Sequence, residues 1–257
     1  MLDRLIRGGV VIDGTGAPRR TADVAIRDGR IAGIGRIDEP AREVVDADGA
    51  IVAPGFVDIH THYDAQLLWD PDVTPSCFHG VTTVVGGNCG FTIAPLAADG
   101  GRYIRRMLAR VEGMPLESLE AGGAWGWRTF GEYLDRVDRG LGINAGFLVG
   151  HSAIRRVVMG DDATSKRATP EQVEQMASIL ADALRAGGLG LSSGRTPVHQ
   201  DYEGARVPSY HASDEELLAL CRVVRAHPGT TLEFAPALSE FEATGETMIR
   251  MSLEAGR

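Results

Sequence analysis

Two histidines, His60 and His62, close the mostly apolar segment 55–62 in the sequence PGFVDIHTHYD. Residues two positions apart on a β-strand point to the same face of the sheet, so both imidazoles can converge on one ion. Neutral imidazole is a common ligand of first-row transition metals. We therefore predict a metal site here. The alternative is a pair of buried histidines that are hydrogen-bonded to the protein.

A cysteine, Cys89, follows the Val- and Thr-rich segment 80–88 in the sequence GGNCGF. In a parallel sheet it would lie at the same edge as the two histidines, one strand further along. A thiolate is a strong ligand for zinc, and the flanking glycines allow a close approach of the backbone. The alternative is a small buried hydrophobic residue, which is how we interpret Cys77 and Cys221.

Four further polar residues lie at or near the ends of later strand-like segments: His151, Ser192, Ser193 and Glu233. We predict Glu233 as a further metal ligand, with an ordinary polar position inside the fold as the alternative. His151, Ser192 and Ser193 are predicted to line the site and to contact the substrate. The serines are not interpreted as nucleophiles, because no G-x-S-x-G motif surrounds them.

The elements that must position these side chains alternate between strands and helices after residue 54. Strands are predicted at 55–62, 80–88, 144–151, 188–194 and 230–237. Two of the intervening helices have the pattern of a capping box, with Thr169 and Gln172 in one and Ser213 and Glu216 in the other. Such alternation is typical of a parallel sheet with right-handed crossovers.

The number of strand–helix units sets the predicted fold class. A closed barrel of this kind needs eight units, and about five are found in residues 55–257. We predict an α/β protein with a partial TIM-like (β/α) barrel over 55–257. Residues 1–54 contain short strand-like segments and the pairs Asp13-Gly14, Asp28-Gly29 and Asp48-Gly49, which are typical of hairpins. They predict a separate small β-sandwich-like domain.

Residues 95–140 are longer than one crossover requires. Helices are expected at about 101–112 and 129–139. Trp125 and Trp127 lie between them and either cap an acyl-chain pocket over the site or form a local core.

Composition narrows the range of partners. The net charge of −9 argues against nucleic acid or an anionic membrane surface as a partner. The three cysteines form no paired framework, which favours a reducing compartment. No apolar run approaches the roughly 20 residues that cross a bilayer, and the N-terminus lacks the pattern of a signal peptide. We expect a cytoplasmic protein.

The motifs PGFVDIHTHYD, HGVTTVVGGNCGFTIAPL, GHSAIRRVVMG and GLSSG resemble, in order, those of the D-aminoacylase family of the amidohydrolase superfamily. The resemblance runs from about residue 4 to residue 230. It implies a barrel joined to a small β-sandwich, a Zn²⁺ cofactor and hydrolysis of an N-acyl-D-amino-acid-like amide. It also implies that His60 and His62 are paired metal ligands and that Cys89 helps to hold the tightly bound zinc.

The chain departs from this family in its later part. The family uses histidines on strands five and six and an aspartate after strand eight as general base, whereas the fifth strand here carries Glu233 and the base is expected beyond residue 257. The only lysine, Lys166, lies in a predicted loop, which disfavours the cyclic amidases that bridge two metals with a carbamylated lysine.

Three interpretations therefore stay open. The first is a deacylase-like hydrolase seen as a fragment or truncated chain. The second is a non-catalytic remnant that binds a metal or self-associates through an open sheet edge. The third is another amidohydrolase, such as a cyclic amidase or a deaminase.

Overall fold

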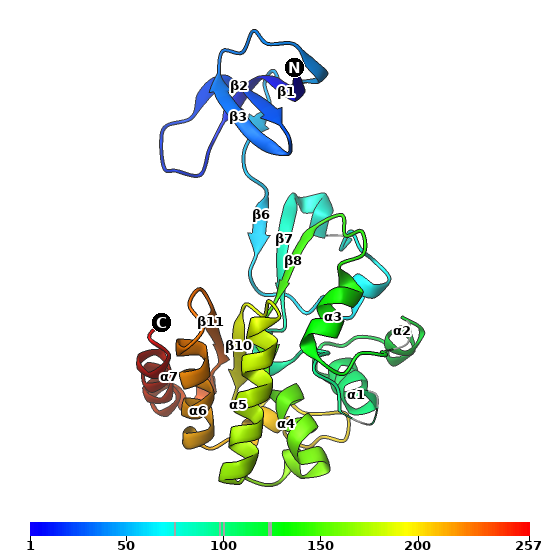
Figure 1. The fold of residues 1–257 in the computed structure, drawn as a ribbon, viewed down its shortest axis with the longest axis vertical. Coiled ribbons are helices and arrows are strands. Elements are labelled where there is room, and N and C mark those ends of the chain that lie inside the picture. The colour runs from blue at the N-terminus through cyan, green and yellow to red at the C-terminus, as the bar shows by residue number, and fades with distance from the viewer. Residues whose placement is uncertain (75, 98, 100, 123–124) are drawn as a thin grey trace. The chain divides into compact units, whose positions relative to one another are not determined.

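The computed structural model describes residues 1–257 except 75, 98, 100, 123 and 124. The chain divides into two compact units, Met1–Phe56 and Val57–Arg257 (Figure 1). Among the described residues, no helix is both long and apolar enough to cross a membrane.

The first unit is a mixed β-sheet. Its strands are β1 (Leu2–Val11), β2 (Arg20–Arg27), β3 (Arg30–Gly35), β4 (Ala41–Asp46) and β5 (Ile51–Val52). The sheet order is β3-β2-β1-β4, and β5 pairs with the far end of β1. β1 and β2 pair antiparallel, as do β2 and β3, whereas β4 and β5 run parallel to β1. These five strands form one sheet and not the two facing sheets of a sandwich.

One of the three predicted hairpins is confirmed. Asp28 and Gly29 form the two-residue turn between β2 and β3, and both have a positive φ, of 51° and 69°. Asp13 instead opens a longer loop, because its Oδ1 accepts the N–H of Thr15 two residues on. The turn at Asp48 joins β4 to β5, and both of these pair with β1 in parallel, so no hairpin forms there.

The second unit contains all five predicted strands. β6 (Phe56–Asp58), β7 (Val81–Gly86) and β8 (Asn144–Phe147) form one sheet, and β9 (Val149–Gly150), β10 (Gly190–Gly194) and β11 (Thr231–Ala235) form a second. The pairs β7–β8, β9–β10 and β10–β11 are parallel. Among the described strands, β6 and β11 are edges, so both sheets are open.

The two sheets meet at Leu148, which interrupts the predicted strand 144–151. Its N–H donates to the carbonyl of Gly86 at 3.0 Å, and the N–H of Leu189 donates to the carbonyl of Phe147 at 2.8 Å. The segment from β8 to β9 therefore bonds β7 on one side and leads to β10 on the other.

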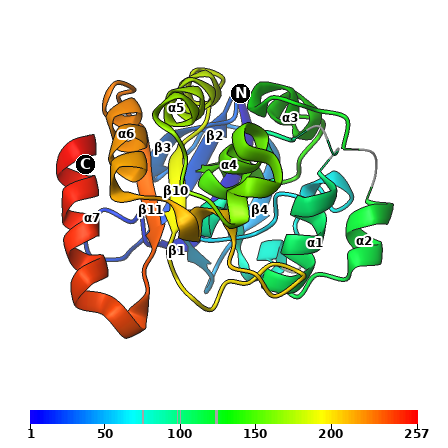
Figure 2. The same ribbon diagram turned by 90° about the horizontal axis from the view of Figure 1, so that it is seen from below.

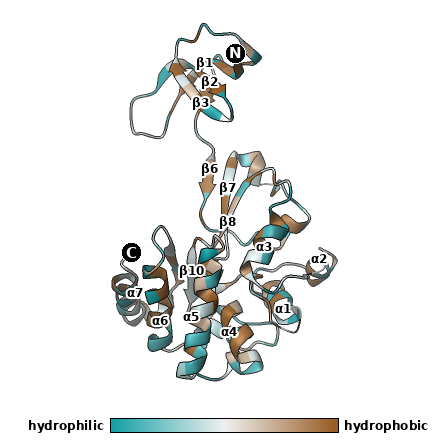
Figure 3. Ribbon diagram, viewed as in Figure 1, coloured by the Kyte–Doolittle hydropathy of each residue, from teal (hydrophilic) through white to brown (hydrophobic). Residues whose placement is uncertain are grey.

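Four helices cover the strands β9–β11 (Figure 2). They are α4 (His151–Met159), α5 (Pro170–Arg185), α6 (Asp214–Arg225) and α7 (Phe241–Ala255). Hydrophobic and hydrophilic residues alternate along α4, α5 and α6 (Figure 3), as one buried face and one exposed face require. The buried faces contribute Ile154, Met176, Leu180, Leu217 and Leu220 to the core.

The capping box predicted at α5 is confirmed. The Thr169 hydroxyl accepts the N–H of Gln172, and the Gln172 side chain accepts the N–H of Thr169. The box predicted at α6 is only half formed, because Ser213 accepts the N–H of Glu216 but the Glu216 carboxylate turns into the core.

The predicted insertion contains the two expected helices and one more. α1 (Arg102–Val111) and α3 (Phe130–Val137) match the prediction, whereas α2 (Leu116–Ala121) was not predicted. The indoles of Trp125 and Trp127 stack at 5.6 Å and are 6% and 4% exposed. Trp127 Nε1 also donates to the carbonyl of Ile93. Both indoles are part of the hydrophobic core, in agreement with the predicted local core and not with the predicted cap over an acyl-chain pocket.

Candidate metal centre

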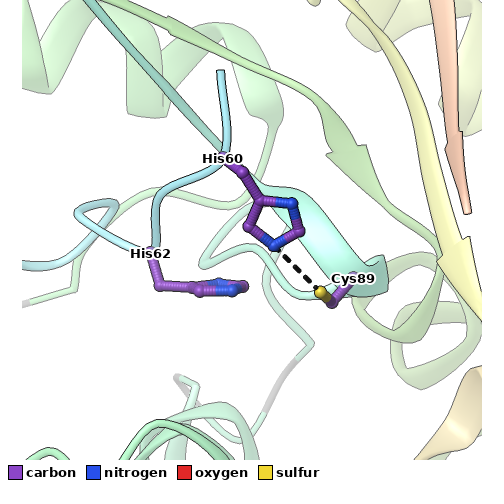
Figure 4. Close-up of side chains that lie close together, drawn as sticks. All are labelled: His60, His62 and Cys89. Atoms are coloured by element: carbon purple, nitrogen blue, oxygen red, sulfur yellow. Dashed lines mark hydrogen bonds between the residues drawn. The ribbon is translucent and has the colours of Figure 1, made fainter. Parts of the chain in front are cut away.

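Three potential ligand atoms converge near the ends of β6 and β7. Those of His60, His62 and Cys89 all lie within 4.8 Å of one another (Figure 4). The Sγ of Cys89 is 3.3 Å from Nε2 of His60, and the two imidazole centroids are 5.5 Å apart. Two nitrogens and one sulfur form a donor set that suits zinc.

The histidines reach this position in a different way from the one predicted. β6 ends at Asp58, so His60 and His62 lie in the turn that follows it and not on the strand itself. The turn stays bound to β7, because both the N–H and the hydroxyl of Thr61 donate to the carbonyl of Val85. The bound turn, and not strand alternation, brings the two imidazoles together.

Cys89 lies in a tight turn, Gly87–Gly90, which follows β7 and contains the 3-10 helix η3 (Asn88–Gly90). The turn is left-handed at three positions, with φ of 74° at Gly87, 57° at Cys89 and 80° at Gly90. Only glycine adopts this conformation freely, which explains the glycines but not the cysteine. At Gly87 a Cβ atom would lie 2.1 Å from the carbonyl oxygen of Leu148, so no side chain fits there.

The pKa values of His62 and Cys89 set their protonation states in the metal-free site. Burial, together with the neighbouring His60 and His199, lowers the pKa of His62 to about 4. His62 is therefore neutral at pH 7, and its buried Nδ1 has no hydrogen-bond partner among the described residues. Burial and the nearby carboxylates of Glu233 and Glu112 raise the pKa of Cys89 to about 12, so a bound cation must supply the charge that stabilises a thiolate.

Carboxylates surround the three ligands. Burial raises the pKa of Asp64 to about 6, and that of Glu112 and of Glu233 to about 7. Glu112 Oε1 lies 3.6 Å from Nε2 of His62. Asp64 is buried, and Glu112 and Glu233 are half-buried. Carboxylates withdrawn from water are costly unless a positive charge compensates them, so their position beside the His–His–Cys group fits a site for a cation.

Sequence reasoning missed Asp64 and Glu112. Asp64 lies two residues after His62 in the motif PGFVDIHTHYD, which was a usable signal. Glu112 follows α1 in the insertion, and its sequence neighbourhood gives no sign that it reaches His62.

Glu233 lies beside the cluster but outside the group of three ligands. Its Oε2 accepts the backbone N–H of Cys89 at 2.7 Å. The structure thus brings Glu233 to the site as a partner of the Cys89 backbone, and its role as a ligand stays a prediction.

The predicted substrate contacts His151, Ser192 and Ser193 are all 0% exposed. His151 is the first residue of α4 and not the end of a strand; its Nδ1 lies 2.9 Å from the Ser193 hydroxyl and its Nε2 lies 2.8 Å from Glu216 Oε1. The Ser192 hydroxyl bonds the turn that carries Cys89. In this structure all three side chains bind other parts of the protein, and a contact with substrate stays a prediction.

The His151 network includes a buried ion pair that sequence reasoning missed. Both carboxylate oxygens of Glu216 accept hydrogen bonds from Arg155 Nη1, and the two side chains are 1% and 0% exposed. Arg155 Nη2 also donates to the carbonyl of Lys166 at 2.8 Å. The Lys166 side chain itself is exposed and pairs with Asp162, so it does not take part in a metal centre.

Comparison with known proteins shows which family the chain belongs to. The chain matches the amidohydrolase family over residues 43–257. It is 38% identical over 229 residues to the D-aminoacylase of Alcaligenes xylosoxydans xylosoxydans, a match that covers 88% of this chain and 43% of that protein. A crystal structure of D-aminoacylase is similar with a TM-score of 0.80 and 36% identity, covering 100% of this chain and 50% of the other.

A second solved structure carries a metal. It is the N-acyl-D-glutamate deacylase from Bordetella bronchiseptica, complexed with zinc and a phosphonate inhibitor, with a TM-score of 0.80 and 34% identity over 99% of this chain and 50% of the other. The chain thus spans about half the length of the relatives that it matches. The resemblance predicted from the motifs is confirmed.

Proposed function

The chain belongs to the amidohydrolase family, and we propose that it carries the zinc-binding part of an N-acyl-D-amino-acid deacylase-like site. The observation that supports this proposal most is the convergence of His60, His62 and Cys89 within 4.8 Å. In this proposal the chain consists of a small β domain, 1–54, followed by an incomplete (β/α) barrel, 55–257.

We propose that the three side chains hold Zn²⁺ with their imidazole nitrogens and thiolate. When bound, such an ion lowers the pKa of a coordinated water towards about 7 and polarises an amide carbonyl. His60 and His62 bind as neutral imidazoles, and Cys89 must lose its proton on binding. We assign these three side chains to metal binding and assign no general base among the described residues.

The proposed substrate is a small N-acyl-D-amino-acid-like amide. This choice rests on the relatives, which are D-aminoacylase and N-acyl-D-glutamate deacylase. The net charge of −9 gives no reason to expect nucleic acid as a partner.

Association through the open sheet is a second candidate function. β11 is an edge strand among the described residues. Several large apolar side chains after it are exposed, with Leu238 77%, Phe241 59%, Ile249 63% and Leu253 73% accessible. An open edge beside an exposed apolar surface favours pairing with another chain or segment.

Metal analysis of the purified chain tests the proposed centre. We expect one equivalent of zinc, and we expect Cys89→Ala to lose it. Cys77→Ala is the matched control, because this thiol is not part of the group of three ligands. A folded chain that holds no zinc, or a Cys89→Ala variant that retains it, would refute the ligand assignment.

Hydrolysis of N-acetyl-D-amino acids, with the L-forms as controls, tests the substrate. Because we assign no general base among the described residues, we expect little or no turnover by these residues alone. Gel filtration of the same sample tests association: a monomer at high protein concentration would argue against the second candidate.

A further inference from the structure

The backbone of the turn that carries Cys89 is held by hydrogen bonds to side chains that lie far away in the sequence. Asp64 Oδ2 accepts the N–H of Gly87 at 3.0 Å. The backbone N–H of Cys89 donates to a side chain of β11, and the backbone N–H of Gly90 donates to a side chain of β10. Every one of these bonds ends on the backbone of the turn, so none of them occupies the thiol.

Glu233 on β11 binds the amide of the cysteine itself. Its Oε2 lies 2.7 Å from Cys89 N, across a separation of 144 residues. This is a normal N–H···O length, and the bond ties β11 to the backbone of the cysteine turn. Glu233 thus fixes the backbone at the residue whose side chain must meet the metal.

Ser192 on β10 binds the turn at two points. Its hydroxyl accepts the N–H of Gly90 at 3.1 Å and donates to the carbonyl of Gly87. Ser192 is 0% exposed and is the register partner of Glu233 across β10 and β11. The two side chains therefore lie next to each other and bind consecutive amides of the turn.

We propose that Glu233 and Ser192 are positioning residues, which hold the Cys89 thiol beside His60 before a metal binds. This inference rests on the proposed metal centre and assigns a role in it to one residue on each of the strands β10 and β11. The serine that sequence reasoning assigned to substrate contact acts on the cysteine turn, and the glutamate acts through the cysteine backbone.

The conformation of Cys89 explains why such support is needed. Its φ of 57° and ψ of 16° lie in the left-handed region, which residues with a side chain rarely adopt. Strained backbone of this kind persists only when surrounding interactions hold it. Without the bonds to Glu233 and Ser192, the turn relaxes and the thiol leaves its position 3.3 Å from His60.

Cobalt titration of the full 257-residue chain measures this effect directly. The charge-transfer absorption between a thiolate and Co²⁺ reports whether Cys89 binds the ion, and the titration gives the dissociation constant. Glu233→Ala and Ser192→Ala should each weaken Co²⁺ binding by about 10- to 100-fold, as supporting partners of metal ligands do, and should reduce the absorption. Glu233→Gln should bind nearly as well as wild type, because its amide oxygen accepts the same N–H.

Ser152→Ala is the matched control. Ser152 is also 0% exposed, and its hydroxyl also accepts a backbone N–H, that of Ser209 at 3.2 Å, which is not an amide of the cysteine turn. It should lose a comparable hydrogen bond without a change in Co²⁺ affinity or absorption. Circular dichroism of each metal-free variant confirms folding; if Glu233→Ala does not fold, Ser192→Ala and Glu233→Gln carry the test.

The possible outcomes separate the two levels of the hypothesis. Unchanged Co²⁺ affinity in Ser192→Ala and in the folded Glu233 variants overturns the positioning role while the metal centre stands. A loss in Glu233→Gln as large as in Glu233→Ala also overturns it and supports Glu233 as a ligand. A wild-type chain without any Co²⁺ absorption refutes the metal centre and the positioning role with it.

Discussion

The buried pair of Glu216 and Arg155 should be a main determinant of the stability of the second unit. In Glu216→Ala, the Arg155 guanidinium loses both carboxylate hydrogen bonds and keeps a charge at a site that is 0% exposed. His151 loses its partner at 2.8 Å at the same time. Breaking a buried ion pair by removing one partner costs about 3–5 kcal/mol, because the remaining charge is uncompensated.

This cost can be measured as a change in the free energy of unfolding. For a unit of this size, about 1 kcal/mol shifts the melting temperature by roughly 2–4 °C, so we expect a decrease of roughly 6–20 °C. Urea unfolding followed by circular dichroism gives the free energy itself. Glu215→Ala is the control, because this neighbouring glutamate on the same helix turn is exposed and should cost less than about 1 kcal/mol.

A second variant separates the lost pair from the uncompensated charge. Replacing both partners, Arg155→Met with Glu216→Leu, removes the charge together with the hydrogen bonds and should cost less than Glu216→Ala alone. The reasoning would be refuted by a Glu216→Ala variant that is no less stable than Glu215→Ala. A double variant that is as unstable as the sum of its single changes would refute it as well.

Three further predictions follow from the same structure. Gly87→Ala, which places a Cβ 2.1 Å from the Leu148 carbonyl at a φ of 74°, should lower the free energy of unfolding by more than about 2 kcal/mol, whereas Gly126→Ala, with nothing within 4 Å, should be nearly neutral in the same urea assay. The contribution of the Glu216–Arg155 pair to stability should fall on acidification: burial alone would raise the pKa of Glu216, but the bonds and charges of His151 and Arg155 lower it to about 2 from the ordinary 4.5, and burial lowers the pKa of His151 from 6.5. Both groups bind protons more readily when unfolded, so this contribution is complete above about pH 6.5 and is lost towards pH 2. Because the raised pKa values of Asp64, Glu112 and Glu233 act in the opposite sense, the contribution is measured as the difference in unfolding free energy between the wild type and the Arg155→Met, Glu216→Leu double variant, and a difference that is flat over this range would contradict it. Glu112→Gln should weaken zinc binding by about tenfold, since this carboxylate lies 3.6 Å from His62, and an unchanged dissociation constant would show that it does not act on the ion.

Features that depend on residues close together in the sequence were predictable. The five strands after residue 54, the helices α1 and α3 within the insertion and the capping box of α5 all appear where apolar periodicity and capping residues indicate them. The His–His–Cys group was equally accessible, because each member follows a strand end and parallel strands bring their carboxyl ends to one edge.

Local patterns were wrong where a tertiary contact competed with them. Glu216 has the position of a capping-box residue, but a buried arginine offers its carboxylate a charged partner that the exposed N-terminus of the helix cannot match. His60 and His62 were expected on a strand, yet the strand ends at Asp58 and a turn bound to β7 carries them.

The sequence by itself thus determined which residues can bind a metal and which family pattern they follow, since residue type and spacing are read along the chain. The tertiary structure alone decided what the remaining polar residues do. Glu112 approaches His62 from the insertion, Glu233 and Ser192 bind the cysteine turn, and Glu216 pairs with Arg155. These contacts join residues 50 to 144 positions apart, and only the packing of strands and helices brings such distant groups within hydrogen-bond distance or close to it.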